Sequence, residues 1–199
     1  MLMSIRPVQF IKGEIFHCFN RGVDKRIIFL DSKDYTYFLK LLTHLNTSDV
    51  LGELRLHINK KPINPPVTIL SYCLLPNHYH LVLYCNEDKV LSKFMQRIGT
   101  AYTMYFNNRY DRSGALFQGK FKAKHIDSDQ YLKQILAYVT HNYIVHDIND
   151  SSLFRNYLDV KNNLVGGLAS NFLDFKKSQK EIVQIIKEIR SRRQDLQLE

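Results

Sequence analysis

The segment VTILSYCLLPNHYHLVLYC, residues 67–85, constrains the fold more than any other part of the chain. Two apolar runs in it are separated by Pro76 and Asn77, a pair typical of tight turns. The second run is apolar on both of its faces, which indicates a strand inside a sheet. The segment therefore predicts two adjacent antiparallel strands at the centre of a sheet.

Two histidines lie at the start of the second predicted strand. Successive side chains of a strand point to opposite faces, so His78 and His80 share one face and Tyr79 takes the other. Imidazole is the commonest metal ligand, and such a pair also suits a phosphate or a catalytic partner. Two ligands do not complete a metal site. An ordinary hydrogen-bonded pair at a sheet end is therefore the alternative interpretation.

Hydrophobic periodicity predicts the remaining elements of the domain. Their order is β-α-β-β-α-β-α, which is typical of a ferredoxin-like or RNA-recognition-like α+β sandwich with an antiparallel sheet. Residues 46–66 are polar and proline-bearing, and they predict a loop or a short hairpin. The predicted strands cover residues 15–20, 67–75, 78–85 and 115–126, and the predicted helices start at Asp31 or Ser32, at about Lys89, and at Asp127 or Ser128.

The end of the chain differs in pattern from the rest. Residues 147–170 are irregular, and Ser178 and Glu181 can form a capping box ahead of an amphipathic helix with a basic face. We predict one domain over residues 1–146 and an extension over 147–199 that ends in this helix.

The charge of the chain indicates its class of partner. The net charge is +9, and 12 Tyr and 12 Phe residues accompany it, which suits phosphate contacts and base stacking. An acidic membrane surface is the competing partner. No segment approaches the roughly 20 apolar residues that span a bilayer, and the first residues lack a long apolar signal core. We therefore expect a soluble intracellular protein with no membrane partner.

One helix offers a candidate nucleophile. At helical spacing Tyr131, Tyr138 and Asn142 form one stripe beside the apolar face of the last predicted helix of the domain. Tyr138 and Asn142 are one turn apart, about 6 Å along the axis, so both can face one small site. A tyrosine that covers the edge of the core with its hydroxyl in water is the alternative.

Basic residues gather in three places along the chain. The stretch ALFQGKFKAKHI alternates, which predicts one apolar face with Phe117, Phe121 and Ala123 and one polar face with lysines. Lysine and arginine residues supply phosphate contacts to nucleic acids. The candidate DNA-binding residues are Arg21, Lys25 and Arg26 after the first strand, Arg109 and Arg112 after the long helix, and Gln118, Lys120, Lys122 and Lys124 on the polar face.

Four stretches in order carry a family resemblance: FHCFNRGVDKRIIF, LLPNHYHLVL, SGALFQGKFKAKHI and YLKQILAYVTHN. They resemble the single-tyrosine HUH transposases, in particular the REP-associated tyrosine transposases of bacteria, over about residues 15–146. The resemblance implies that His78-Tyr79-His80 is the HUH motif, that Tyr138 is the nucleophile and that Asn142 is an amide ligand. Family members commonly read Asn-Pro-Val where this chain has Asn142-Tyr143-Ile144, so we expect the helix to continue past Asn142.

The resemblance also implies an activity. It is metal-dependent cleavage and strand transfer of single-stranded DNA, hence DNA transposition, through a 5′-phosphotyrosine intermediate on hairpin-containing REP-like DNA. His78, His80 and Asn142 would hold Mg²⁺ or Mn²⁺. The implied location is the bacterial cytoplasm at the nucleoid, and a homodimer stays open.

Two other functions compete with this one. A non-catalytic single-stranded nucleic-acid-binding module of the same fold would keep the basic surface, but it has no need for the two histidines and the tyrosine together. A metal or nucleotide hydrolase would want a third histidine where Val82 stands or a nearby Asp-His pair, and the segment HYHLVLYCNED has neither.

Overall fold

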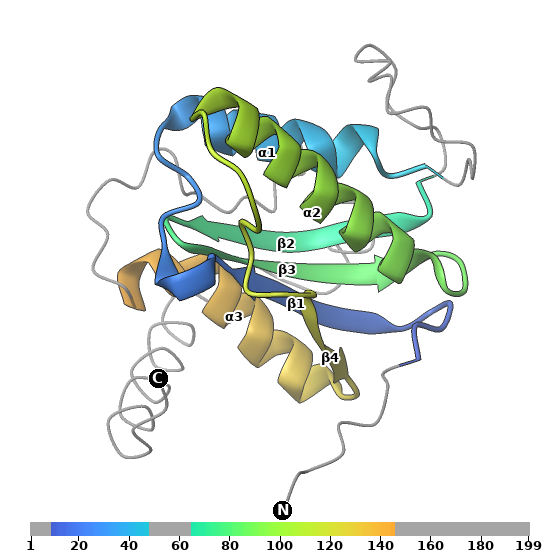
Figure 1. Ribbon diagram of the computed structural model, residues 1–199. Coiled ribbons are helices and arrows are strands. Elements are labelled where there is room, and N and C mark those ends of the chain that lie inside the picture. Colours follow the sequence, from blue (N-terminus) through green and yellow to red (C-terminus); the bar gives the residue numbers. More distant parts are fainter. Residues whose placement is uncertain (1–8, 48–64, 146–199) are drawn as a thin grey trace, which may run out of the picture.

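The computed structural model describes residues 9–47 and 65–145. Its four strands form one antiparallel sheet in the order β2-β3-β1-β4. Helices α1 and α2 cover one face of this sheet and helix α3 covers the other (Figure 1). This arrangement confirms the predicted ferredoxin-like α+β class. The bounds are β1 Ile15–Arg21, η1 Val23–Lys25, α1 Ser32–His44, β2 Val67–Leu75, β3 His78–Cys85, α2 Val90–Arg109, β4 Lys122–Ile126 and α3 Asp129–Val145.

Strand β3 lies inside the sheet, as predicted, but β2 is an edge strand, although almost all of its residues are buried, so the prediction of two central strands is correct only for β3. Strand β3 lies between β2 and β1, and all of its residues except Tyr84 are buried. The turn between the two strands is held from the side, because the backbone N–H groups of Ile28 and Phe29 both donate to the Pro76 carbonyl, at 2.7 and 3.0 Å. This half-buried turn thus has polar backbone groups satisfied by a neighbouring segment.

The two faces of the sheet bury different parts of the core. Toward α1 and α2, strand β3 contributes Tyr79, Leu81 and Leu83 to a large apolar cluster. Toward α3, Val82 of the same strand packs in a smaller cluster with Leu132, Ile135, Leu136 and Val139 of that helix. The alternation of strand side chains therefore divides the core into two layers, one on each side of the sheet.

Two helix starts agree with their predicted positions, and the structure selects Asp31 over Ser32 and Ser128 over Asp127 as the capping residues. The Asp31 carboxylate accepts from the backbone N–H groups of Lys33 and Asp34, at 2.9 and 3.2 Å, and so caps α1. The Ser128 hydroxyl accepts from the Tyr131 N–H at 3.3 Å and caps α3. Helix α3 runs past Asn142 to Val145, as expected where proline is absent.

The predicted strand over residues 115–126 is shorter than the pattern indicated. Strand β4 begins only at Lys122, and Phe117 forms a single isolated bridge to Gly22. Gly119, with φ of +92°, has a backbone conformation that a strand cannot contain.

This interruption divides the predicted lysine face. Lys122 and Lys124 share the face of the sheet that α3 covers, because they pair with Phe19 and His17 of β1. Lys120 precedes the strand and lines a pocket on the opposite side, beside α2. The prediction of one continuous lysine face is therefore wrong at Lys120, because the turn at Gly119 breaks the alternation.

Three predictions lie outside the described residues. The loop or hairpin predicted over residues 46–66 lies mostly there, as does the whole extension over 147–199 with its capping box at Ser178 and Glu181. The division of the chain at residues 146 and 147, and the amphipathic C-terminal helix, stay predictions.

Candidate active site

The register of the strands gathers the candidate residues on the face that α3 covers. Strand β1 pairs with β3 so that Phe19 lies opposite His80 and Arg21 opposite His78. The same strand pairs with β4 so that Phe19 lies opposite Lys122. Neighbouring strands are about 4.8 Å apart, so Lys122 lies about 10 Å from His80 across the sheet.

The ring of His80 is at the centre of this group. Its Nδ1 atom lies 2.9 Å from Nε2 of His17, and the two buried rings stack with centroids 5.1 Å apart. The ring of His78 meets it edge to face at 5.1 Å. From α3, the half-buried Tyr138 makes a second edge-to-face contact with His80 at 5.6 Å. The fold therefore brings together His78, His80 and Tyr138, which are up to 60 positions apart in the chain.

The ring of His78 is held by the turn that precedes strand β3. His78 Nδ1 lies 2.6 Å from the side-chain oxygen of Asn77, and the amide nitrogen of Asn77 donates to the Lys25 carbonyl at 3.1 Å. The backbone carbonyl of Asn77 accepts from the Gly22 N–H at 2.9 Å. The segment after β1 therefore fixes the position of the turn and of the ring that follows it.

Burial determines the protonation state of His17, beside His80, and of Tyr79, on the opposite face of the sheet. Desolvation, followed by the nearby positive charge of Lys124, lowers the pKa of His17 to about 4, so this ring is neutral at pH 7. On the opposite face, burial raises the pKa of Tyr79 well above its usual range. Tyr79, which stands between the two histidines, is therefore a core residue and is unsuited to act as a nucleophile.

Two imidazole nitrogens of the site could bind a divalent ion, whose other ligands would come from outside this pair of histidines. Both Nδ1 atoms are engaged, by His17 and Asn77, so Nε2 is the ligand atom that His78 and His80 can offer. No group of three or more His, Cys, Asp and Glu side chains within residues 9–47 and 65–145 is arranged to hold a metal. Further ligands would thus be amide, phosphate or water oxygens, a mixed set that suits Mn²⁺ better than Mg²⁺.

Asn142 is the candidate for the amide ligand. It lies in α3 one turn after Tyr138, about 6 Å along the helix axis. Its role as a ligand stays a prediction.

Several of the predicted DNA-binding residues are exposed near the histidines. Lys122 and Lys124 are exposed on β4, and Arg21 ends β1 beside His78. Lys25 and Arg26 are exposed in and after η1, where Arg26 lies 3.5 Å from the Asp24 carboxylate. Gln118 is exposed and its backbone N–H donates to the Arg21 carbonyl at 2.8 Å.

In the parts of the chain that the structure describes, no helix has the length and hydropathy needed to cross a bilayer.

Arg109 and Arg112 lie away from this group and have partners within the protein. Arg109 forms ion pairs with Asp31 at 2.5 Å and with the fully buried Asp34 at 2.6 Å. Arg112 bonds to the side chain of Asn107 and to a backbone carbonyl. Both arginines therefore stabilise the end of α2.

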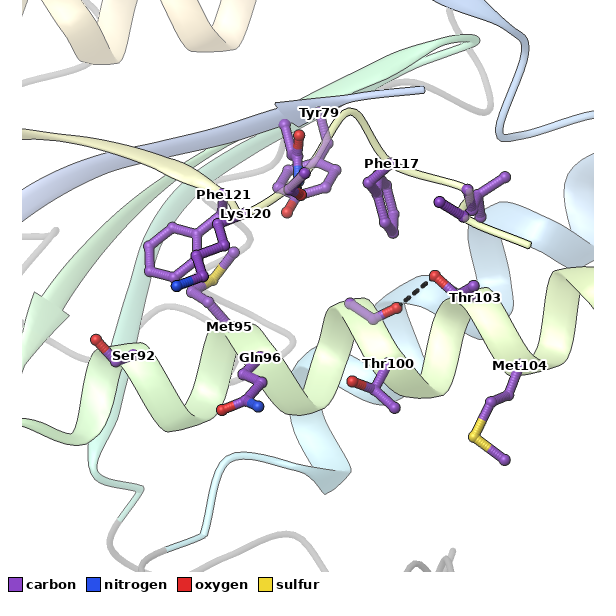
Figure 2. Close-up of a pocket in the computed structure, with 15 residues that line it drawn as sticks. Tyr79, Ser92, Met95, Gln96, Thr100, Thr103, Met104, Phe117, Lys120 and Phe121 are labelled. Atoms are coloured by element: carbon purple, nitrogen blue, oxygen red, sulfur yellow. Dashed lines mark hydrogen bonds between the residues drawn. The ribbon is translucent and has the colours of Figure 1, made fainter. Parts of the chain in front are cut away.

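A pocket of about 730 Å³ lies on the other side of the sheet, between α2 and the segment that leads into β4 (Figure 2). One wall is helix α2, which presents Ser92, Gln96, Thr100 and Thr103. The opposite wall carries Phe117 and Phe121, with Lys120 beside them. Tyr79 of strand β3 also lines the pocket. The pocket therefore combines aromatic, hydroxyl and cationic groups.

Two residues next to the candidate ligands were not predicted from the sequence. His17 stands in the stretch FHCFNRG, and Asn77 was interpreted only as a turn residue. The alternation within β1 could have indicated the face of His17, but only the pairing with β3 shows that this face belongs to His80. Asn77 could have been noticed because Asn side chains in turns often accept hydrogen bonds from their neighbours.

Comparison with known proteins agrees with this geometry. Residues 42–142, just over half of the chain, match the family model described as "Transposase IS200 like". The chain therefore belongs to the IS200-like transposase family. A solved structure of a REP-associated tyrosine transposase bound to a REP hairpin is similar in fold, with a TM-score of 0.54 and 17% identity over 72% of this chain and 74% of that one. A comparison with curated proteins finds no match.

Proposed function

We propose that this transposase cleaves and rejoins single-stranded DNA with Tyr138 as the nucleophile. The observation that carries the proposal is the contact of the Tyr138 ring with His80 at 5.6 Å, across the interface of α3 and the sheet. The family makes a DNA-processing activity the expected one. A chain that only bound DNA would have no reason to place a tyrosine against a histidine that itself contacts a second histidine.

The chemistry conserves the number of phosphate ester bonds. The Tyr138 oxygen attacks a backbone phosphorus, the bond between phosphorus and the 3′ oxygen breaks, and a 5′-phosphotyrosine forms. The phenol loses its proton to an acceptor, and the leaving 3′ oxygen gains one to become a hydroxyl. Attack by the 3′-hydroxyl of a second DNA end reverses the step and regenerates the tyrosine, so no external energy source is needed.

The neighbouring residues would position the scissile phosphate. We propose that His78 and His80, with Asn142, hold a divalent ion, Mn²⁺ or Mg²⁺. When bound, such an ion offsets the negative charge of the transition state and orients the phosphate. Lys122, Lys124 and Arg21 lie on the same face, and they would contact phosphates on either side of the cleaved one.

The pocket beside α2 would receive an unpaired base of the same strand. Its aromatic wall suits base stacking, and its hydroxyl and amide groups suit hydrogen bonds to a base edge. Strand β4 lies at the edge of the sheet, so a single strand can pass around it from the histidine face to the pocket. The relative of similar fold was solved with a REP hairpin, and we propose a hairpin with adjacent single strands as the substrate here.

A covalent adduct tests the proposal. The full-length protein is incubated with labelled single-stranded hairpin DNA and Mn²⁺, and mass spectrometry locates the modified residue. We expect the nucleotide on Tyr138. The Tyr138→Phe variant should form no adduct and still bind DNA, with a stability loss of no more than about 1 kcal/mol for one hydroxyl. Tyr131→Phe, on the same helix, is the matched control and should react like the wild type.

Each contrary result has a separate meaning. An adduct on Tyr131 would keep the transposase chemistry and move the nucleophile. Cleavage by Tyr138→Phe at the wild-type rate would indicate a metal-dependent nuclease that uses water. DNA binding without cleavage or adduct would favour the non-catalytic binding module.

A further inference from the structure

We propose that Asn77 and His17 are positioning residues, which hold the rings of His78 and His80 so that both rings present Nε2 as the metal-binding atom. This inference rests on the proposed function, because it takes the two histidines as the ligands. It concerns the tautomer of each ring, meaning which of the two ring nitrogens carries the hydrogen. A neutral imidazole has one N–H and one lone pair, and only the nitrogen with the lone pair can bind an ion.

For His78 the hydrogen bonds determine the tautomer. The amide group of Asn77 is oriented by its donor bond to the Lys25 carbonyl, at 3.1 Å, so its oxygen faces the ring. An amide oxygen only accepts hydrogen bonds. Because it lies 2.6 Å from His78 Nδ1, that nitrogen carries the hydrogen. Nε2 then keeps the lone pair.

The carbonyl that orients Asn77 is itself fixed by a tight turn. Lys25 has φ of +59° and its N–H donates to the Gly22 carbonyl at 3.1 Å. A Cβ atom at Gly22 would lie 2.3 Å from the Arg26 carbonyl oxygen, so only glycine fits there without movement of the backbone. The stretch NRGVDKR thus sets the orientation of a side chain that is about 50 residues away in the sequence.

For His80 the partner is another imidazole. The Nε2 atom of His17 lies 2.9 Å from His80 Nδ1, and the His17 ring is buried and stacked on Phe19 at 5.0 Å. His17 can donate or accept in this bond. If His80 is to bind an ion through Nε2, its Nδ1 must donate and His17 must accept. Strand pairing and stacking hold the His17 ring at the distance where it can do so.

The tautomers can be measured directly, without metal or substrate. Long-range ¹H–¹⁵N spectra of the full-length protein in chelator distinguish a ring with hydrogen on Nδ1 from one with hydrogen on Nε2. We expect Nδ1–H for both His78 and His80. In Asn77→Ala the His78 ring should become a mixture of tautomers. In Asn77→Asp, which also loses the bond to Lys25 but keeps an acceptor oxygen, the ring should stay Nδ1–H.

Mn²⁺ titration measures the consequence. Loss of the partner of a ligating histidine typically weakens metal binding 10- to 100-fold, so Asn77→Ala and His17→Phe should each bind Mn²⁺ at least about tenfold more weakly. His17→Gln keeps an acceptor oxygen and should bind more tightly than His17→Phe. Cleavage by the two weakened variants should recover at high Mn²⁺. Asn86→Ala, which removes a side-chain amide that donates to the Pro65 carbonyl and the Thr68 hydroxyl just after the far end of β3, is the matched control and should match the wild type.

Three results would overturn the inference, and a fourth would overturn the proposed metal site on which it rests. Hydrogen on Nε2 of either ring in the wild type would contradict it, as would equal loss of Mn²⁺ affinity in Asn77→Ala and Asn77→Asp, which would indicate a merely structural asparagine. If His78→Ala itself binds Mn²⁺ like the wild type, then the proposed metal site fails. If only His78→Ala is weakened and Asn77→Ala is not, the site stands and the positioning role fails.

Discussion

The two faces of the sheet are built from the same strands and have different properties. Strand β3 directs Tyr79 and Leu81 toward α1 and α2, where both are almost completely buried in the larger apolar cluster. It directs His78 and His80 toward α3, where they meet Tyr138 and His17. Neighbouring residues of one strand thus belong to a close-packed core on one side and to a cluster of imidazoles on the other.

The difference shows how this small domain can hold polar groups rigidly near its centre. The apolar face anchors β3 between two strands and against two helices, so the backbone that carries the histidines is already fixed. On the α3 face, only some of the side chains pack in the apolar cluster, so the others can be polar residues that bind or react.

Adjacent substitutions in β3 should give the sharpest contrast. His80→Ala should lower cleavage about 100-fold or more, since it removes an electrostatic element of the site, and should leave most of the DNA affinity. Leu81→Ala, at a fully buried position, should lower the free energy of unfolding by about 2–5 kcal/mol, with near-normal cleavage by the molecules that stay folded. Urea denaturation and single-turnover cleavage measure the two effects. His44→Ala, a histidine on α1, is the control, and an equal loss of cleavage in it would contradict the site assignment.

The two faces should also differ in their response to acid. The pKa of His17 is about 4 in the folded protein, below the unfolded value of 6.5, so the unfolded chain binds the proton first as the pH falls. Stability from this group is therefore complete above about pH 6.5 and is lost progressively toward pH 4, by about 3 kcal/mol in total. On the other face, Cys18 and Tyr79 stay protonated in this range in the folded and the unfolded chain, because their ordinary pKa values lie above it and burial raises them further.

Comparison with a variant isolates the contribution of His17. Urea denaturation of the wild type and of His17→Phe, in chelator and between pH 7.5 and 4.5, gives the difference in pH dependence. The variant should lose less stability on acidification. Identical pH dependence of the two proteins would show that His17 titrates normally and that its surroundings are more polar than the structure indicates.

Filling the pocket beside α2 should weaken DNA binding without removing the chemistry. A Cβ atom at Gly99 meets nothing within 4 Å, so Gly99→Leu occupies the pocket and also favours the helix. Loss of one stacked base costs about 1–3 kcal/mol, so affinity for hairpin DNA should fall roughly tenfold. Asn108→Leu, at an exposed position of the same helix, is the matched control. Unchanged affinity in Gly99→Leu would remove the pocket from the DNA path.

The smallest expected effect concerns salt. If about five phosphates of a single strand are neutralised, the slope of log K against log salt concentration should be about −3 to −4. Replacing both Lys122 and Lys124 by Gln should reduce its magnitude by about 1.4, since each phosphate contact contributes about 0.7. The same change at Lys33 and Lys40, which are exposed on α1, is the control. An equal reduction in both double variants would mean that β4 has no special part in binding.

The sequence by itself determined most of the elements and, within β3, the facing of the side chains. The turn at Pro76 and Asn77 and the shared face of His78 and His80 were predicted, and the structure confirms them. Helix starts were predicted at Asp31 or Ser32 and at Asp127 or Ser128, and the structure selects Asp31 and Ser128 as the caps. Each of these features depends on residues within a few positions of one another. Local backbone geometry and periodicity are sufficient to define them.

Only the tertiary structure decided which distant residues meet. Strand order and register place His17 against His80 and the Lys25 carbonyl against Asn77. Helix packing places the Arg109 guanidinium against Asp31 and Asp34, although Arg109 was expected to bind DNA. The turn at Gly119 moves Lys120 off the lysine face. These contacts depend on how strands and helices separated by up to 78 positions pack together. Such packing follows from the free energy of the whole core, and no local pattern in the sequence contains it.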